Sequence, residues 1–278
     1  MKTVAICNHK GGTGKTTTVI HLAAALGLSG YRTLVIDLDP QSFLTRMLGV
    51  GERRDAGSSA DLFSHDFDLS ASPLLKMRGF DLLPSSPSLT GVMRRLTKPL
   101  DVFWAKEALE GREDYDFVLF DTAAAVTVFS LNALVASTCV LVPVTPEYQP
   151  VLGAEQTYQT VRQVQDKLNP TLAAPVFLFT QVDGRKRSHH QYRSYFRKAY
   201  GPSVMRSIIR TSAALAVQHG DGSTTFDHDP YSRGARDYAN ATDEFLRLMA
   251  ADAGAAQPVD DGALRHDAAA VMMSKLAS

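Results

Sequence analysis

The segment that most constrains the fold lies near the N-terminus, where a short apolar run leads into a glycine-rich loop and then a helical pattern. Residues 3–7 (TVAIC) are apolar and largely β-branched, which predicts a buried strand. Helical periodicity then runs from Thr16 to Leu28, and residues 33–37 (TLVID) predict a second strand. A strand, loop, helix and strand in this order form a βαβ unit, which requires a parallel sheet covered on both faces.

The remainder of the chain continues this alternation of buried strands and helices. Residues 151–167 predict a long helix, and further strands are expected at residues 80–83, 117–121, 139–144 and 176–180. The pattern predicts an α/β domain with a doubly wound, mostly parallel sheet flanked by helices, over residues 1–250. Residues 251–278 are expected to form a linker and a short C-terminal tail with a helical pattern.

The loop between the first strand and the first helix carries the clearest chemical signal. Glycines allow backbone N–H groups to close around a phosphate, and the N-terminus of the following helix adds its dipole. Lys15 is placed to reach the β- and γ-phosphates of a nucleotide, and the Thr16 hydroxyl to bind Mg²⁺. The usual pattern has glycine where this chain has His9, and this chain has a lysine one position later. The expected cofactor-binding residues are Lys10, Gly11, Gly12, Thr13, Gly14, Lys15, Thr16 and Thr17.

This loop and several later segments resemble the ParA/MinD group of deviant Walker ATPases, and within it the ParA/Soj branch. Residues 10–17 (KGGTGKTT) match the deviant Walker A motif, residues 35–41 (VIDLDPQ) match Walker A′, and residues 117–122 (FVLFDT) match Walker B. Residues 142–148 (VPVTPEY) and 229–235 (DPYSRGA) match later stretches of the family. The resemblance covers about residues 1–250 and implies a P-loop ATPase with ATP and Mg²⁺ as cofactors.

The resemblance also implies a role for each matching residue. Lys10 would cross to the nucleotide of a partner subunit in an ATP-bound homodimer, where cations offset the charge on the transferred phosphoryl group. Asp39 would position the attacking water, and Asp37 and Asp121 would hold the Mg²⁺ shell together with Thr16. The expected catalytic residues are Lys10, Lys15 and Asp39.

One departure from the family follows the Walker B strand. The family usually continues as Asp-Thr-Pro-Pro, whereas this chain has Ala123, Ala124 and Ala125 after Thr122. Prolines fix φ and stiffen a loop, so we expect this segment to be less stiff and hydrolysis to be less tightly coupled to conformational change. Nucleotide binding does not depend on those prolines.

The distribution of charge is uneven although the sum is zero. Lys+Arg and Asp+Glu both number 29, which by itself counts against a polybasic nucleic-acid binder. Residues 184–220, however, contain eight Lys or Arg and no Asp or Glu. We interpret these cations as a phosphate-binding surface and expect the interleaved aromatic residues to face the core. The segment resembles the region through which the ParA family binds DNA nonspecifically, although a second family arginine is replaced within residues 212–215 (SAAL). The expected DNA-binding residues are Arg185, Lys186, Arg187, Arg193, Arg197, Lys198 and Arg210.

The leading interpretation is a cytoplasmic, nucleoid-associated ATPase with slow hydrolysis that positions or segregates a plasmid, a chromosome locus or a protein cargo. A ParB-like or other cargo-adaptor protein would stimulate hydrolysis. One alternative is a MinD-like ATPase anchored to membranes by its tail, but residues 261–278 offer only Arg265 and Lys275 as basic residues and no aromatic side chain. A second alternative is a nucleotide-switched DNA-binding module with little hydrolysis. Cys7 and Cys139 lie in expected strands, which argues against an iron–sulfur reductase.

Overall fold

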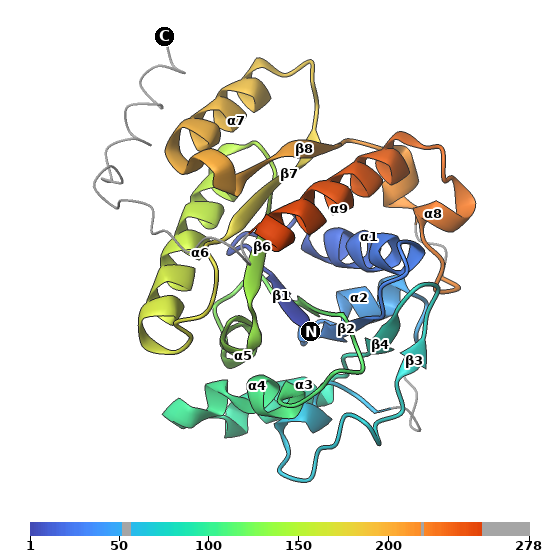
Figure 1. Cartoon of the computed structure of the whole chain (residues 1–278), viewed down its shortest axis with the longest axis vertical. Helices are drawn as coiled ribbons and strands as arrows, with labels where there is room; N and C mark the ends of the chain where they lie inside the picture. Colours follow the sequence, from blue (N-terminus) through green and yellow to red (C-terminus); the bar gives the residue numbers. More distant parts are fainter. Residues whose placement is uncertain (52–56, 218–219, 252–278) are drawn as a thin grey trace.

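An eight-stranded sheet forms the centre of the computed structural model, which describes residues 1–51, 57–217 and 220–251 (Figure 1). The strand order is β3-β4-β2-β5-β1-β6-β7-β8, and every neighbouring pair is parallel except β3 and β4. The expected doubly wound, mostly parallel α/β fold is therefore confirmed. The strands are β1 (Lys2–Ile6), β2 (Thr33–Asp37), β3 (Leu75–Lys76), β4 (Asp81–Leu83), β5 (Phe117–Asp121), β6 (Cys139–Val144), β7 (Val176–Val182) and β8 (Val204–Arg210).

Helices cover both faces of this sheet (Figure 1). One face is covered by α1 (Lys15–Leu28), α2 (Phe43–Met47), α8 (Thr225–His228) and α9 (Arg233–Ala251). The other face is covered by α3 (Ser88–Arg95), α4 (Trp104–Leu109), α5 (Val128–Ala136), α6 (Tyr148–Lys167) and α7 (Arg187–Tyr200). No helix among the described residues is long and apolar enough to cross a membrane.

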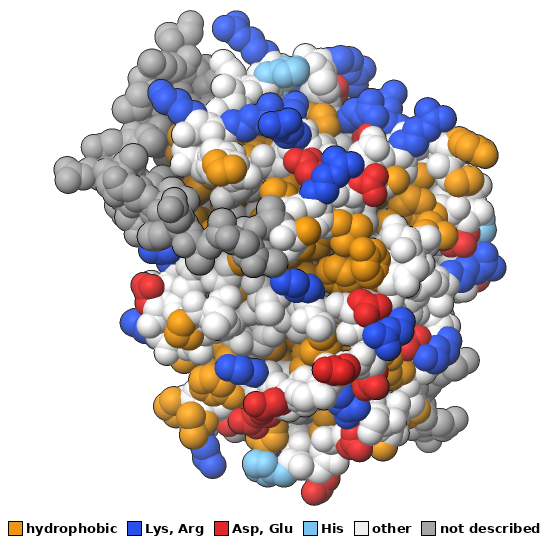
Figure 2. Space-filling view, viewed as in Figure 1, with side chains coloured by type: hydrophobic (Ala, Val, Ile, Leu, Met, Phe, Trp, Pro, Cys, Tyr) orange, Lys and Arg blue, Asp and Glu red, His pale blue; other side chains and the backbone are white. Residues whose placement is uncertain are grey.

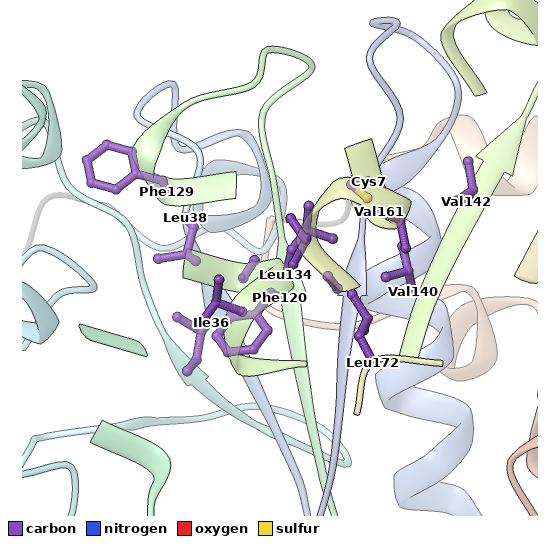
Figure 3. Packing of buried hydrophobic residues seen from close by; sticks show 14 of the residues in the cluster. Cys7, Ile36, Leu38, Phe120, Phe129, Leu134, Val140, Val142, Val161 and Leu172 are labelled. Carbon is purple, nitrogen blue, oxygen red and sulfur yellow. The ribbon is translucent and has the colours of Figure 1, made fainter. Parts of the chain in front are cut away.

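The hydrophobic core consists of two clusters, one on each face, because successive side chains of a strand point to opposite sides. In β5, Phe117 and Leu119 pack in the cluster beneath α1 and α9, while Val118 and Phe120 pack in the cluster beneath α5 and α6. Figure 3 shows the second cluster, to which Phe120 of β5 and Leu134 of α5 both belong. A central strand buried on both faces explains the nearly continuous apolar runs of the sequence.

Acidic side chains of α9 cover the outer edge of β8, the last strand of the sheet. Both carboxylate oxygens of Glu244 accept hydrogen bonds, from the Arg206 and Ser207 backbone N–H groups at 2.6 and 2.7 Å. Asp237 accepts one from the Arg210 N–H at 2.9 Å. At the opposite edge, β3 has only two residues. Helix α9 therefore satisfies backbone donors that would otherwise face outward along β8.

The predicted elements agree best where the sheet is fully buried. Strands β2, β5 and β6 have the predicted bounds, whereas β3 and β8 were not predicted. Helix α6 begins three residues earlier than predicted, and Pro150 fits because its missing N–H lies in the first turn, where no intrahelical partner is needed. Of the predicted linker and tail, residues 251–278, Ala251 is the last residue of α9, and residues 252–278 lie outside the described residues.

Candidate nucleotide site

The phosphate loop follows β1 at the carboxyl end of the sheet, the edge at which open α/β sheets bind their ligands. Gly12 and Gly14 have φ values of 76° and 81°, in the left-handed region that glycine adopts without steric cost. Helix α1 then begins at Lys15, so the unpaired N–H groups of its first turn lie beside the loop. This geometry fits the backbone cradle expected from the sequence.

Two predicted site residues, Thr16 and Asp121, are in direct contact. The Thr16 hydroxyl donates a hydrogen bond to Asp121 Oδ2 at 2.8 Å, and the Asp121 carboxylate is completely buried. Its other oxygen, Oδ1, has no hydrogen-bond partner among the described residues. Burial, reinforced by the neighbouring charge of Asp37, raises the Asp121 pKa well above its ordinary value. A hydroxyl beside an unsatisfied buried carboxylate fits the oxygen ligands that Mg²⁺ takes together with phosphate.

Lys15 lies next to this pair. Its ammonium group donates a hydrogen bond to the Lys10 backbone carbonyl at 3.2 Å, and the residue is only 9% exposed. Burial lowers the Lys15 pKa, while the Asp121 carboxylate opposes that change. A buried cation held by a loop carbonyl is available to a phosphate at the same loop.

Asp37 and Asp121 are register partners on β2 and β5, but their carboxylates differ in hydrogen bonding. Asp37 Oδ1 accepts a hydrogen bond from the Asp39 N–H at 3.1 Å. Asp37 Oδ2 accepts two from Thr45, from the N–H at 3.1 Å and the hydroxyl at 2.7 Å. Burial raises the Asp37 pKa to about 6 despite these bonds. Because both oxygens are already engaged, the predicted role of Asp37 toward Mg²⁺ remains a prediction and is limited to an indirect contact.

Asp39 lies in the turn that leaves β2. Its side chain accepts a hydrogen bond from the Gln41 N–H at 2.8 Å, and its backbone carbonyl accepts one from the Ser85 hydroxyl, also at 2.8 Å. Ser42, which follows, has a left-handed φ of 53° and donates its N–H to the Asp39 carbonyl. The Asp39 carboxylate is close enough to raise the pKa of both Lys15 and Asp121. The fold therefore brings Asp39 to the same edge as Lys15, Thr16 and Asp121.

Lys10 lines a cavity of about 610 Å³ whose lining does not include Lys15, Thr16 or Asp121. Its N–H donates to Asn8 Oδ1 at 2.9 Å, and the Asn8 amide donates to the Pro143 carbonyl at 2.8 Å. Gly153 of α6 lies against this turn, because a Cβ there would be 2.7 Å from Asn8 Oδ1. The cavity is lined by Lys10, Gly11 and Gly12 and by residues of the β6–α6, β7–α7 and β8 ends, including Glu147, Tyr148, Lys186 and His189.

Two residues that the sequence analysis missed also hold the loop. The Thr180 hydroxyl donates to the Thr13 carbonyl at 2.7 Å, and the Gln181 amide donates to the Gly12 carbonyl at 2.6 Å. Both residues lie at the carboxyl end of β7. Their position at the end of a parallel strand is the signal that could have identified them.

The basic segment, residues 184–220, contains α7, which carries an exposed basic face, and the edge strand β8. Tyr192, Phe196 and Tyr200 are buried in the core as expected, and Tyr195 donates a hydrogen bond to Glu155 at 2.7 Å. Lys and Arg side chains gather at the upper end of the molecule in Figure 2, where α7 lies in Figure 1. The exposed cations of α7 are Arg187, Arg197 and Lys198, and Arg193 is partly buried.

Other cations of the segment contact acidic residues. Arg210 donates from Nε and Nη2 to both oxygens of Asp237, at 3.0 and 2.5 Å, and Asp237 is 5% exposed. Arg185 forms an exposed pair with Asp183 at 2.9 Å. Lys186 lies 3.7 Å from Glu147. Arg210 is therefore part of the contact between β8 and α9, and its predicted role toward DNA remains a prediction.

Comparison with known proteins finds similarity to ATPases over most of the chain. A family model described as an AAA domain matches residues 1–174. The chromosome-partitioning ATPase Soj of Thermus thermophilus is 35% identical over 251 residues, which are 88% of this chain and 96% of that protein. A structure of cobyrinic acid a,c-diamide synthase from Mycobacterium smegmatis with ADP and magnesium is 30% identical, with a TM-score of 0.75 over 94% of this chain and 99% of that one. The septum site-determining protein MinD from Pyrococcus horikoshii shares the fold, with 20% identity and a TM-score of 0.71 over 91% of this chain and 99% of that one.

The sheet order, the glycine loop and the Lys15–Thr16–Asp121 group define a P-loop ATPase of the deviant Walker type. Within that class, the chain belongs to the ParA/Soj family, which the sequence resemblance had indicated.

Proposed function

We propose that this chain binds ATP and Mg²⁺ at the phosphate loop, hydrolyses ATP slowly, and acts as a nucleotide-dependent positioning protein on DNA. The observation that carries the proposal is the 2.8 Å contact between Thr16 and the buried Asp121, beside Lys15 at the start of α1. When bound, Mg²⁺ would neutralise phosphate charge. Thr16 and Asp121 would hold the metal, Lys15 would bind the β- and γ-phosphates, and Asp39 would orient the attacking water.

Lys10 supports the proposal that the ATP-bound form is a homodimer. Lys10 lines the cavity described above, and Lys15, Thr16 and Asp121 do not. From this position Lys10 would act on the nucleotide of a second copy. Hydrolysis would then require pairing, which is the property that a positioning cycle needs.

The exposed face of α7 supports nonspecific binding to DNA. Cations that neutralise phosphates release counterions and bind without reading sequence. We infer that pairing of two copies doubles this surface, so that ATP raises the affinity for the nucleoid. A ParB-like or other adaptor would stimulate hydrolysis and release a plasmid, chromosome locus or protein cargo.

Retention on a DNA-coated surface tests this proposal. The full chain is passed over DNA with Mg²⁺ and ATP, ADP or no nucleotide, and its mass in solution is measured in parallel. We expect strong retention and a dimer only with ATP. Lys15→Ala should lose ATP binding, whereas Asp39→Ala should bind ATP and remain dimeric without turnover. Equal retention in all three states would contradict the proposal.

A second candidate is a DNA-binding switch with little hydrolysis, and the loop after β5 favours it. Ala123 and Ala124 replace two prolines, although the loop is held at its ends by hydrogen bonds from Thr122 to the Ile6 carbonyl and from Ser130 to the Ala125 carbonyl. Single-turnover hydrolysis with and without DNA separates the two candidates. The membrane-anchored alternative depends on residues 261–278, which lie outside the described residues, and co-sedimentation of the full chain with liposomes tests it.

A further inference from the structure

Gln181, at the end of β7, has an unusual backbone conformation. Its φ is 52°, and Ser42 is the other non-glycine residue with positive φ in the described part of the chain. A residue with a side chain adopts this region only at a cost in free energy, and such strain persists where surrounding contacts fix it. Both residues lie at the carboxyl edge of the sheet, beside the nucleotide site.

The strained conformation allows two consecutive side chains to reach the same loop. In a regular strand, successive side chains point to opposite faces. Thr180 and Gln181 nevertheless both donate hydrogen bonds to the phosphate loop, at 2.7 and 2.6 Å. The pairing of β7 with β8 shifts register between Phe179 and Val182, which is the kind of irregularity that redirects a side chain.

These two hydrogen bonds set the orientation of two successive peptide groups. In a trans peptide, the C=O and the N–H of the same unit point in opposite directions, and no cis peptide occurs among the described residues. Because Gln181 holds the Gly12 carbonyl, the N–H of Thr13 is turned away from β7. Because Thr180 holds the Thr13 carbonyl, the same is true of the N–H of Gly14. Successive N–H groups turned to one side form an anion-binding concavity.

We propose that Gln181 is a positioning residue for the phosphate loop. Its amide fixes the Gly12–Thr13 peptide before a ligand arrives, so that less ordering is needed when the diphosphate of a nucleotide binds. This role rests on the nucleotide binding proposed above. Because ATP and ADP both contain the diphosphate, loss of this role should weaken the binding of both nucleotides to the same extent.

Three variants test the proposal, with ATP and ADP titrated calorimetrically in the presence of Mg²⁺. Gln181→Met keeps the length of the side chain and removes the donor. Gln181→Gly also removes the donor, but glycine adopts the left-handed conformation freely. Gln163→Met changes an exposed glutamine on α6 and serves as the matched control.

Both Gln181 variants should raise the Kd of ATP and of ADP by about three- to tenfold, the loss expected for one hydrogen bond. In Gln181→Gly the affinity should fall while the Tm stays unchanged or rises. If Gln181 only stabilised the fold, the Tm would fall as well. Amide exchange of residues 10–14 should become faster in the nucleotide-free protein. KM for ATP should rise while kcat changes less than about twofold, and Gln163→Met should match the parent.

Wild-type affinity in both Gln181 variants would overturn this inference and leave the proposed function intact. Failure of the parent protein to bind ATP or ADP would instead overturn the proposed function. A fall in affinity in Gln181→Gly that is accompanied by an equal loss in Gln163→Met would also count against the role of Gln181, because the effect would then not be specific to the loop.

Discussion

At the scale of single residues, the most consequential feature is the pair of carboxylates at the ends of β2 and β5. Asp37 and Asp121 are register partners, both are fully buried, and burial raises the pKa of each. The hydrogen bonds from Thr45 and the Asp39 N–H stabilise the charged form of Asp37. Asp121 accepts one from Thr16, and its Oδ1 has no partner in the part of the chain that the structure describes. Asp121 is therefore the carboxylate that gains most from a bound divalent cation.

Replacing Asp121 with Asn should stabilise the metal-free protein at neutral pH. A carboxyl group whose pKa is raised by folding contributes stability below its ordinary pKa, and that stability is lost as the pH rises through the folded-state pKa. The advantage of the Asn variant over the parent should therefore grow as the pH rises from about 4, the ordinary pKa of an aspartate. Urea denaturation at several pH values, without Mg²⁺, measures this difference.

The same variant should respond less to ligand. Mg²⁺ with ADP should raise the Tm of the parent and raise that of Asp121→Asn much less, because the variant retains the partner of Thr16 but not the charge. A constant difference in stability between the two proteins across the pH range would contradict the assigned cause.

Arg210 provides a second prediction at this scale. Arg210→Ala should lower the free energy of unfolding by about 1–2 kcal/mol, because Asp237 is left buried without its partner; the value is reduced by the exposure of the arginine side chain. Arg187→Ala on α7 is the matched control, and its change should stay within about 0.5 kcal/mol. Urea denaturation measures both, and equal effects would contradict a structural role for Arg210.

At the scale of elements, α6 is packed directly against the phosphate loop. Gly153→Ala should destabilise the protein by about 1–3 kcal/mol, because the new Cβ would lie 2.7 Å from Asn8 Oδ1 and 2.9 Å from Lys10 Cβ. It should also lower ATP turnover by displacing Lys10. Gly91→Ala on α3, where a Cβ meets nothing within 4 Å, should instead stabilise by about 0.5–1 kcal/mol. Calorimetry and turnover measurements distinguish these outcomes.

The exposed face of α7 should carry the nonspecific affinity for DNA. Removing the side chains of Arg197 and Lys198 together should weaken ATP-dependent retention. Because the proposed dimer would lose two cations from each copy, the slope of log K against log salt should become less negative by about 3–4. The matched pair Arg94 and Arg95 is exposed on α3, and its replacement by Ala should leave the slope unchanged. Equal slopes in all three proteins would show that α7 is not the DNA surface.

The fold and the phosphate loop could be predicted because their signals are local. Strands such as β5 are continuous apolar runs, and the glycine loop is defined by its neighbours in sequence. The end of a parallel strand could have marked Thr180 and Gln181 as lying near the site. Their hydrogen bonds to the loop could not be predicted, because these join residues 167 and 169 positions apart. β8 was missed because Arg206 and Arg210 were interpreted only as charge, although both are exposed residues of an edge strand.

At the scale of the whole molecule, charge in the sequence and charge in space differ. Residues 184–220 contain no acidic residue, yet folding brings Glu147, Glu155, Asp237 and Glu244 from other elements against them. The basic surface is therefore smaller than the segment that encodes it. The exposed cations of α7 lie at one end of the molecule (Figures 1 and 2), whereas the exposed Arg185 and Lys186 are paired with Asp183 and Glu147.

The acidic cover over β8 also limits how two copies of this chain can meet. An open strand edge is a permanent template for adding a further strand, and it leads readily to aggregation. Here Asp237 and Glu244 engage the backbone donors of one edge, and the two-residue β3 shortens the other. Association along the described sheet is thereby disfavoured. In the proposed ATP-bound homodimer, contacts between copies would then be made by loops and side chains. A bound nucleotide could raise or abolish the affinity of such contacts, so that assembly would be reversible in each cycle.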